Sequence, residues 1–407
     1  MVVAGTLKRL SRRIFTLAAC LALVWITAGF HRSASADQNV YVAAGIPVDI
    51  TGDIATLRDK AMIQAQRAGL QKVLASIASP DALKDVALPS DDVITSWVQD
   101  FEIEEEKTSA SRYIGRFTFR FMADPIRQFL AENNVAYAET VSKAVLVLPV
   151  YTSETGDTEL WGPTNPWLAA WAARPSQPGL VPIQAPVGDL PDTNTITATQ
   201  ALAGDAARIQ ALSDRYAAGE VIVAEAAMQA PTADGKRTLT LSVVSYGSDQ
   251  PHSVKDQVTG DAANVDQLLK DGVERVAALV QNSWKQENLV DPSQKATVSV
   301  HVPFTTLGQW VEIKRHLAQV NLVKSVNLTN LSRTGADLQL TYLGDEVQFA
   351  RALSQADLLI TSSGEGLETM TLAPGGANNA GATDGGAGSS DGGTDSGDGV
   401  DNTTEPQ

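Results

Sequence analysis

The chain has 407 residues, of which 43% are hydrophobic and 19% are charged. A chain of this length holds about two to four domains, and this composition excludes disorder over most of it. The net charge of −16 argues against a nucleic-acid-binding protein, because such proteins carry basic surfaces. Cys20 is the only cysteine, so neither an internal disulfide nor a cysteine-based zinc site can form.

Residues 1–36 are typical of an export signal. Basic residues precede an apolar run, Ile14–Phe30, which includes Cys20, and the small-x-small sequence Ala34-Ser35-Ala36 follows. We therefore expect cleavage after Ala36, a mature chain that begins at Asp37, and a periplasmic location. The alternative is an uncleaved membrane anchor, since the apolar run is just long enough to span a bilayer. The cleavage sequence favours removal, which would leave no stable membrane anchor.

Two export routes remain open. Ser11-Arg12-Arg13-Ile14-Phe15 resembles a twin-arginine motif, which serves folded cargo, whereas the strongly apolar run also suits general secretion. Both routes carry the protein across the inner membrane.

Residues 373–407 form a tail of mainly small and polar residues that has acids but no lysine or arginine. Such a segment cannot bury enough apolar surface to offset the entropy of ordering, so we expect a disordered, acidic, Gly-rich tail. Its aspartates do not keep the spacing of EF-hand loops or of calcium-binding nonapeptide repeats, so we predict no calcium site there.

The first folded unit is expected over residues 37–140. A strand over Val40–Ile50 is followed by a helix over about 54–78, whose apolar residues recur at three- and four-residue spacing. The alternation of apolar and polar residues then predicts a long antiparallel hairpin, with strands at 94–103 and 112–122. Its turn is predicted to be the solvated acidic run Glu104–Glu106. This order predicts an α+β domain.

The second unit is expected over residues 141–292. Its first strand, Lys143–Tyr151, is continuously apolar, which is typical of a strand buried on both faces. A loop rich in Trp and Pro follows, and then a Pro-rich irregular stretch over 181–192. The remaining elements are predicted as helix, strand, strand and helix at 199–216, 220–227, 237–246 and 261–285, with a loop at His252. This order predicts an α/β domain with a small mixed sheet.

The third unit, residues 295–372, has the predicted order β-α-β-β-α-β. Valines alternate with polar residues over 296–302, and a hairpin crosses Ser332–Gly335. One last strand is expected within Leu358–Leu372. This is the ferredoxin-like plan, so the predicted fold class is a series of small α+β and α/β units.

No sequence motif for nucleophilic catalysis, phosphate binding or metal binding is present. The histidines do not share metal-ligand spacing, and we expect neither a cofactor nor a metal. The carboxylate pairs Asp49/Asp53 and Asp189/Asp192 leave a carboxylate-dependent hydrolase as a third alternative. Capping and turn roles suit these aspartates better, so we predict a protein that is not an enzyme.

The loop rich in Trp and Pro is the best candidate for a binding surface. Three tryptophans fall within residues 161–171, and two of them stand four residues apart on one face of a predicted helix. One interpretation is an aromatic platform for a carbohydrate, a peptide or a protein partner. The other is a lid that packs over the sheet. The candidate residues are Trp161, Asn165, Trp167, Trp171 and Asp189.

Several strings together resemble a proteobacterial family of unknown function, domain of unknown function 2066. The resemblance covers most of residues 37–291 and excludes the tail. The strings are Val48–Asp53, Lys60–Ala68, Trp97–Glu102, Arg112–Gly115, Val145–Tyr151, Leu160–Trp167, Gly188–Leu190 and Arg215–Tyr216. The family implies no activity, so it supplies no catalytic residues. The tandem units are also similar in architecture to envelope-assembly proteins, such as flagellar-basal-body and curli-secretion accessory proteins.

These features together favour an exported periplasmic protein that acts as a scaffold or adaptor in the cell envelope. It would contact envelope proteins through exposed strand edges and the Trp-rich loop, with no nucleic-acid partner. The alternative is a periplasmic ligand-binding module, with loop 161–171 and residues 182–192 at the mouth of a pocket. The oligomeric state is left open by the sequence.

Overall fold

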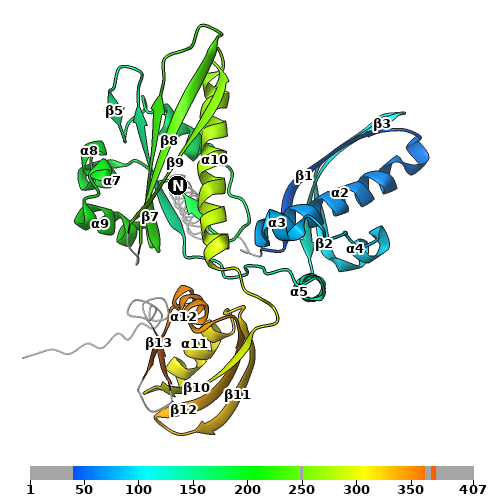
Figure 1. Ribbon diagram of the computed structural model, residues 1–407, viewed down its shortest axis with the longest axis vertical. Coiled ribbons are helices and arrows are strands. Elements are labelled where there is room, and N and C mark those ends of the chain that lie inside the picture. Colours follow the sequence, from blue (N-terminus) through cyan, green and yellow to red (C-terminus); the bar gives the residue numbers. More distant parts are fainter. Residues whose placement is uncertain (1–39, 248–250, 363–367, 373–407) are drawn as a thin grey trace, which may run out of the picture.

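The computed structural model describes residues 40–247, 251–362 and 368–372, which form three units, each built around one sheet (Figure 1). The predicted signal, the cleavage site between Ala36 and Asp37, and the acidic tail lie outside the described residues. Each unit combines helices with strands, which confirms the predicted mixture of α and β structure. Among the described helices, none combines the length and the apolar character that crossing a bilayer requires.

The first unit is a three-stranded antiparallel sheet covered by one long helix (Figure 1). The alternation in its central strand turns Phe117, Phe119 and Phe121 inward, and Phe119 and Phe121 approach Gly69 of the helix. The helix begins at Asp53, whose side chain accepts a hydrogen bond from the amide of Ala55 at 3.1 Å. The strand order is β1-β3-β2, and the elements are β1 (Val42–Thr51), α2 (Ile54–Ile77), α3 (Pro80–Leu83), α4 (Asp91–Trp97), β2 (Val98–Thr108), β3 (Arg112–Phe121) and α5 (Ala123–Glu132).

The prediction of a turn at the acidic run Glu104–Glu106 is wrong. This run lies within β2 and not in a turn, because β2 extends to Thr108. β2 is an edge strand, so its acids remain in solvent and face basic residues of β3, as in the cross-strand pair of Glu105 and Arg116. The start of the predicted strand is instead helix α4, whose first turn holds two aspartates that favour a helix N-terminus.

The second unit is a mixed sheet with helices on both faces (Figure 1). β4 and β7 are parallel neighbours at its centre, and their residues point alternately into two cores. α6 and α10 cover one face, and α8 and α9 cover the other. The elements are β4 (Val145–Thr152), β5 (Thr158–Glu159), α6 (Pro166–Ala172), β6 (Ile183–Gln184), α7 (Leu190–Thr195), α8 (Ala198–Leu202), α9 (Ala206–Tyr216), β7 (Glu220–Met228), β8 (Lys236–Tyr246), β9 (His252–Asp261) and α10 (Val265–Glu287).

Two features of this unit differ from the prediction. The helix expected over 199–216 is split into α8 and α9 at Gly204, whose φ of +70° is left-handed. The segment after Pro251, predicted as a loop, is the edge strand β9, which pairs antiparallel with β8. Its residues are mostly polar because its side chains are largely exposed, so the apolar alternation that identifies a half-buried strand is weak.

The third unit follows the predicted order up to its last helix and then departs from it. The expected single last strand is a hairpin, and its second arm lies beside the first strand of the unit, parallel to it. The strand order is therefore β11-β12-β10-β14-β13. The elements are β10 (Lys295–Pro303), α11 (Leu307–Leu317), β11 (Val323–Leu331), β12 (Gly335–Leu343), α12 (Glu346–Gln355), β13 (Leu358–Ser362) and β14 (Glu368–Leu372).

The carboxylate of Glu139, which is 1% exposed, lies where the first and third units meet. It accepts hydrogen bonds from the Tyr41 hydroxyl and from Arg127 Nε of the first unit, the latter at 2.6 Å. In the third unit, Asn321 donates to the Glu139 carbonyl at 3.0 Å, and Lys324 Nζ lies 4.0 Å from the carboxylate. Glu139 thus joins the first unit to the third through charge and hydrogen bonding. We call Glu139, Tyr41, Arg127, Asn321 and Lys324 the junction cluster.

Candidate functional site

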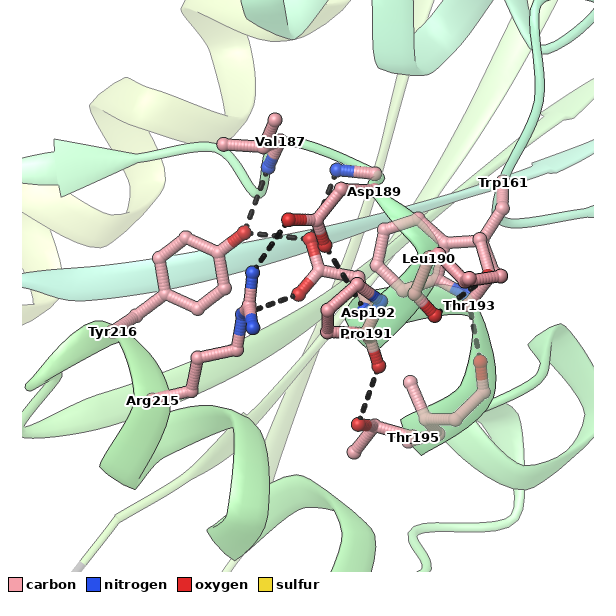
Figure 2. Close-up of polar contacts among 12 residues, drawn as sticks. Trp161, Val187, Asp189, Leu190, Pro191, Asp192, Thr193, Thr195, Arg215 and Tyr216 are labelled. Carbon is pink, nitrogen blue, oxygen red and sulfur yellow. Dashed lines mark hydrogen bonds and ion pairs between the residues drawn. The ribbon is translucent and has the colours of Figure 1, made fainter.

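The most distinctive polar cluster of the second unit surrounds Asp192, whose side chain is fully buried (Figure 2). Asp192 Oδ2 accepts hydrogen bonds from the amide of Gly188 at 2.9 Å and from the Tyr216 hydroxyl at 2.6 Å. Asp192 Oδ1 lies 2.9 Å from Nε of Arg215, which balances the buried charge. The carboxylate therefore ties residues 187–192, called the 187–192 loop below, to the end of α9.

The local sequence explains why the chain turns at this point. Gly188 has a φ of +73°, a conformation that glycine adopts at little cost. Asp189 then caps α7, since its Oδ1 accepts from the amide of Asp192 at 3.1 Å, and Pro191 lies in the first turn, where a missing amide hydrogen is tolerated. Turn, cap and buried carboxylate thus lie within five consecutive residues.

Arg215 and Tyr216 hold the 187–192 loop from the other side. Arg215 Nη2 lies 2.7 Å from Asp189 Oδ2, so one guanidinium bridges both aspartates (Figure 2). The Tyr216 hydroxyl donates to Asp192 and accepts from the amide of Val187 at 2.8 Å. Burial, followed by the hydrogen bond to Asp192, raises the pKa of Tyr216, so its hydroxyl stays protonated and can still donate at alkaline pH.

Two large apolar side chains are presented to solvent by this anchored loop. Val187 is 76% exposed and Leu190 is 72% exposed. A pocket of about 460 Å³ has Val187 in its wall. Its other wall residues include Trp171, Arg174, Pro175, Ile183 and Pro186. The result is a fixed apolar loop at the mouth of a partly apolar pocket.

Of the predicted site residues, Asp189 and Trp171 belong to this region and Trp161 supports it. Trp161 is half-buried, and its indole Nε1 donates to the carbonyl of Ile196 at 2.6 Å, just after α7. Trp171 lines the pocket, although only 3% of it is exposed. Trp171 thus lies in the wall of the pocket, and Asp189 caps α7.

Asn165 and Trp167 lie in the interior rather than on an exposed binding surface. The Asn165 side chain caps α6 and donates to the carbonyl of Pro149 at 3.0 Å. Trp167 is fully buried, and its Nε1 donates to the carbonyl of Ala224 at 2.9 Å. Its ring packs against Trp171 edge to face, and α10 approaches it at Gly272, where a Cβ would meet the ring at 3.1 Å. These two residues have the packing role of the lid interpretation.

Sequence reasoning did not single out Val187, Leu190, Arg215 or Tyr216 as site residues. The structure brings Gly188–Leu190 and Arg215–Tyr216 together, and both are among the strings behind the family resemblance. A partial signal was therefore present in the sequence. No sequence signal indicated that Val187 and Leu190 are exposed, because their exposure is set by contacts between segments about 25 residues apart.

The carboxylate pairs considered for hydrolysis have other partners. Asp192 is buried against Arg215, and Asp189 caps a helix. Asp49 pairs with Arg112 at 2.5 Å, a guanidinium that lowers the pKa of the Asp49 carboxyl, and Asp53 caps α2. Within the described ranges, no three His, Cys, Asp or Glu side chains gather as a metal site.

Two of the histidines that the structure describes have structural partners. His301 lies across from Asp337 in the pairing of β10 with β12, with Nδ1 2.6 Å from the carboxylate. This contact helps to lower the pKa of Asp337. His316 is buried, and its Nδ1 contacts the carbonyl of Ala356 at 2.8 Å, which fits a satisfied core histidine.

Comparison with known proteins gives distant structural neighbours. No family model and no curated protein matches the chain. Lipoprotein GNA1162 from Neisseria meningitidis is 16% identical, with a TM-score of 0.24, over 34% of this chain and 99% of its own. A PelC dodecamer subunit from Paraburkholderia phytofirmans is 10% identical, with a TM-score of 0.21, over 35% of this chain and 90% of its own. An uncharacterized protein has a TM-score of 0.17, with 7% identity over 36% of this chain and 95% of its own.

Proposed function

We propose that this protein is an exported, non-enzymatic adaptor of the cell envelope that binds a protein partner at the 187–192 loop and the adjoining pocket. The observation that supports this most is that Val187 and Leu190 are exposed and yet held in place by a buried carboxylate. The predicted export signal supports the location. Membership of the domain of unknown function 2066 family remains a prediction of the same kind.

The energetics of the loop explain why this observation points to binding. Burying Asp192 removes a charge from water, and this is tolerated only because Arg215, Tyr216 and the Gly188 amide compensate it. Ordering the loop also opposes folding by about 1–2 kcal/mol per residue. The apolar side chains gain little from this order in the free protein, since they stay in water. They would gain from it when a partner covers them, because a preorganised surface loses less entropy on binding.

The surface indicates the chemistry of the partner. Val187 and Leu190 favour an apolar contact, and the pocket can receive one apolar side chain between Pro175 and Pro186. Arg174 at the pocket is held by Glu274, with Nε 3.2 Å from its carboxylate. We therefore expect a protein segment that inserts one apolar anchor and surrounds it with polar groups.

Site-specific crosslinking in the native host tests the proposal. A photo-crosslinking amino acid at Ser176, an exposed residue in the pocket wall, should capture one reproducible envelope protein that mass spectrometry identifies. Adding Val187→Ser and Leu190→Ser should lower the yield roughly tenfold or more, since each lost apolar contact is worth about 1 kcal/mol.

Leu307→Ser provides the matched control. Leu307 is 73% exposed on α11 of the third unit, so its substitution removes a similarly exposed apolar side chain elsewhere. The control should leave the crosslinked product unchanged. The proposal is wrong if no envelope protein is captured, or if the captured protein is equally abundant after the Val187 and Leu190 substitutions.

A second candidate function is the binding of a small molecule in the same pocket. The volume of about 460 Å³ is in the range of ligand sites, and a Trp171 wall would report occupancy by fluorescence. A screen of small periplasmic solutes by tryptophan fluorescence tests this candidate. Saturable quenching that the Val187 and Leu190 substitutions do not change would favour it over the adaptor.

A further inference from the structure

The edge strand β11 of the third unit has neither the several charges nor the proline that keep the other long edges apart from neighbouring chains. β2 carries five acids, β9 carries Lys255, Asp256 and Asp261, and β1 has Pro47. β5 is only two residues long, and β13 only five. β11 has nine residues and a single charge, Lys324.

The charge of Lys324 does not guard the edge of β11 against pairing with another strand, because its ammonium is engaged within the chain. Its ammonium donates to the carbonyl of Asn321 at 3.0 Å and lies 4.0 Å from Glu139, and only 30% of the side chain is exposed. Burial lowers its pKa. Because this lysine belongs to the junction cluster, the outer edge of β11 presents no free charge.

β11 also exposes apolar side chains on one face of its sheet. Val326, Leu328 and Leu331 are 47%, 51% and 54% exposed. Their partners on β12 are Leu340, Leu338 and Ala336, which are buried on the face that the helices cover. Cross-strand partners point to the same face. The three residues thus lie on the same face of the sheet as the core of the third unit, but α11 and α12 do not cover them.

The sequence of β11 is self-complementary about Asn327. An antiparallel strand paired with its own copy about a two-fold axis at residue 327 places 326 opposite 328, 325 opposite 329, 324 opposite 330 and 323 opposite 331. In Val-Lys-Ser-Val-Asn-Leu-Thr-Asn-Leu, every apolar residue then meets an apolar one, and every polar residue meets a polar one. No like charges meet, and the two Asn327 amides face each other, where each can both donate and accept.

We infer that β11 pairs antiparallel with β11 of a second copy of this chain, with the two-fold axis at Asn327. The pairing joins two five-stranded sheets and covers Val326 and Leu328 of each copy. Figure 1 shows β11 at the outer edge of its sheet, on the side away from β13. Register shifts at Val323/Ser325 and at Leu328/Asn330 leave only Ser325–Leu328 regular. The contact therefore rests on Val326, Asn327 and Leu328, and the outer pairs of this register lie beyond the regular segment. This inference does not depend on the adaptor function, which uses a different unit.

The oligomeric state of the processed protein, exported with its own signal, tests the inference. Light scattering after size exclusion should give twice the chain mass at micromolar concentration. Asn327→Lys places two lysines directly opposite each other, so the dissociation constant should rise at least roughly tenfold. Asn327→Asp should do the same, and an equimolar mixture of the two variants should recover a dimer. Gln257→Lys on the edge strand β9 is the matched control and should leave the dimer intact.

A cysteine crosslink reads the register directly, because the predicted mature chain contains no native cysteine. Asn327→Cys should form a disulfide dimer on mild oxidation, since the paired Cα atoms would lie about 4.5–5.5 Å apart. Ser325→Cys should not, because its copies would lie about 13 Å apart. A monomer at all concentrations overturns the inference. So does a dimer that tolerates Asn327→Lys, or an Asn327→Cys variant that crosslinks to a different protein.

Discussion

Two buried carboxylates in this molecule have partners of the same residue types, but they hold different parts of the molecule in place. Asp192 and Glu139 are 0% and 1% exposed, and each accepts a hydrogen bond from a tyrosine hydroxyl and pairs with an arginine. Around Asp192, all partners come from the second unit, and the group holds one surface loop. Around Glu139, the partners come from two units, and the group holds a junction between them.

The difference shows that the role of such a cluster follows from what it connects. A buried carboxylate is tolerated only when its partners stay in place, so each cluster makes one arrangement of its surroundings strongly preferred. At Glu139 this arrangement fixes how the first and third units meet. At Asp192 it fixes a loop whose apolar side chains Val187 and Leu190 are exposed. We therefore expect loss of Glu139 to weaken folding, and loss of Asp192 to weaken binding.

Glu139→Ala should have the largest effect on stability. It leaves Arg127 and the Tyr41 hydroxyl without their buried acceptor, and such a loss costs about 3 kcal/mol in free energy of unfolding. Urea unfolding followed by circular dichroism measures the change in the transition that includes the first unit. Asp124→Ala is the matched control, because Asp124 also pairs with Arg127 but its side chain is 92% exposed, so its loss should not be resolved. Equal effects of the two substitutions would contradict a junction role for Glu139.

Asp192→Asn should have a smaller and local effect. The amide keeps the size of the side chain but loses the charge opposite Arg215, which we expect to cost the 187–192 loop about 2 kcal/mol. Hydrogen exchange at the amides of Val187 and Gly188 should therefore speed up about 30-fold, with little change in global unfolding.

Asp189→Asn is the control for that experiment. Asn caps helices about as well as Asp does, and the Asp189 side chain is already 40% exposed, so exchange should change little. The capture of a partner by the Ser176 crosslinker should fall with Asp192→Asn and remain with Asp189→Asn. A variant that exchanges faster but still captures its partner would show that loop order is not required for binding.

The parts of the fold that could be predicted are those with strong periodicity. The alternation in β3 and the apolar run of β4 were assigned correctly, because one or two buried faces determine which residues they contain. β9 and the acidic end of β2 were missed since both are edge strands with mostly exposed side chains. The final hairpin of the third unit was missed for a different reason, as strand order depends on pairing between distant segments.

The candidate site was predicted only where a residue acts through its neighbours in sequence. Asp189 was identifiable as a cap, and Trp171 as a buried ring on a short helix. Arg215 and Tyr216 act through space on residues about 25 positions earlier, and no local pattern encodes this contact. The same holds for Glu139, whose partners are 98 residues away in Tyr41 and 182 residues away in Asn321.

The two tyrosines give an effect that is absent at neutral pH and appears only above pH 10. Burial and then the neighbouring carboxylate raise the pKa of both Tyr41 and Tyr216, so the folded protein keeps these protons above pH 10, where the unfolded chain loses them. Stability from each cluster is therefore complete below pH 10 and falls as pH rises further. For the almost fully buried Tyr41 the slope approaches about 1.4 kcal/mol per pH unit.

Replacing each tyrosine with phenylalanine separates the two clusters. Tyr41→Phe should flatten the loss of global stability between about pH 10 and 11.5, measured by urea unfolding at each pH. Tyr216→Phe should leave that profile nearly unchanged and should flatten only the alkaline opening of the 187–192 loop, measured by limited proteolysis of the purified protein at each pH. If Tyr216→Phe changed the global profile as much as Tyr41→Phe, the Asp192 cluster would stabilise the core of its unit. Its exposed loop would then be a by-product of folding rather than a surface held for a partner.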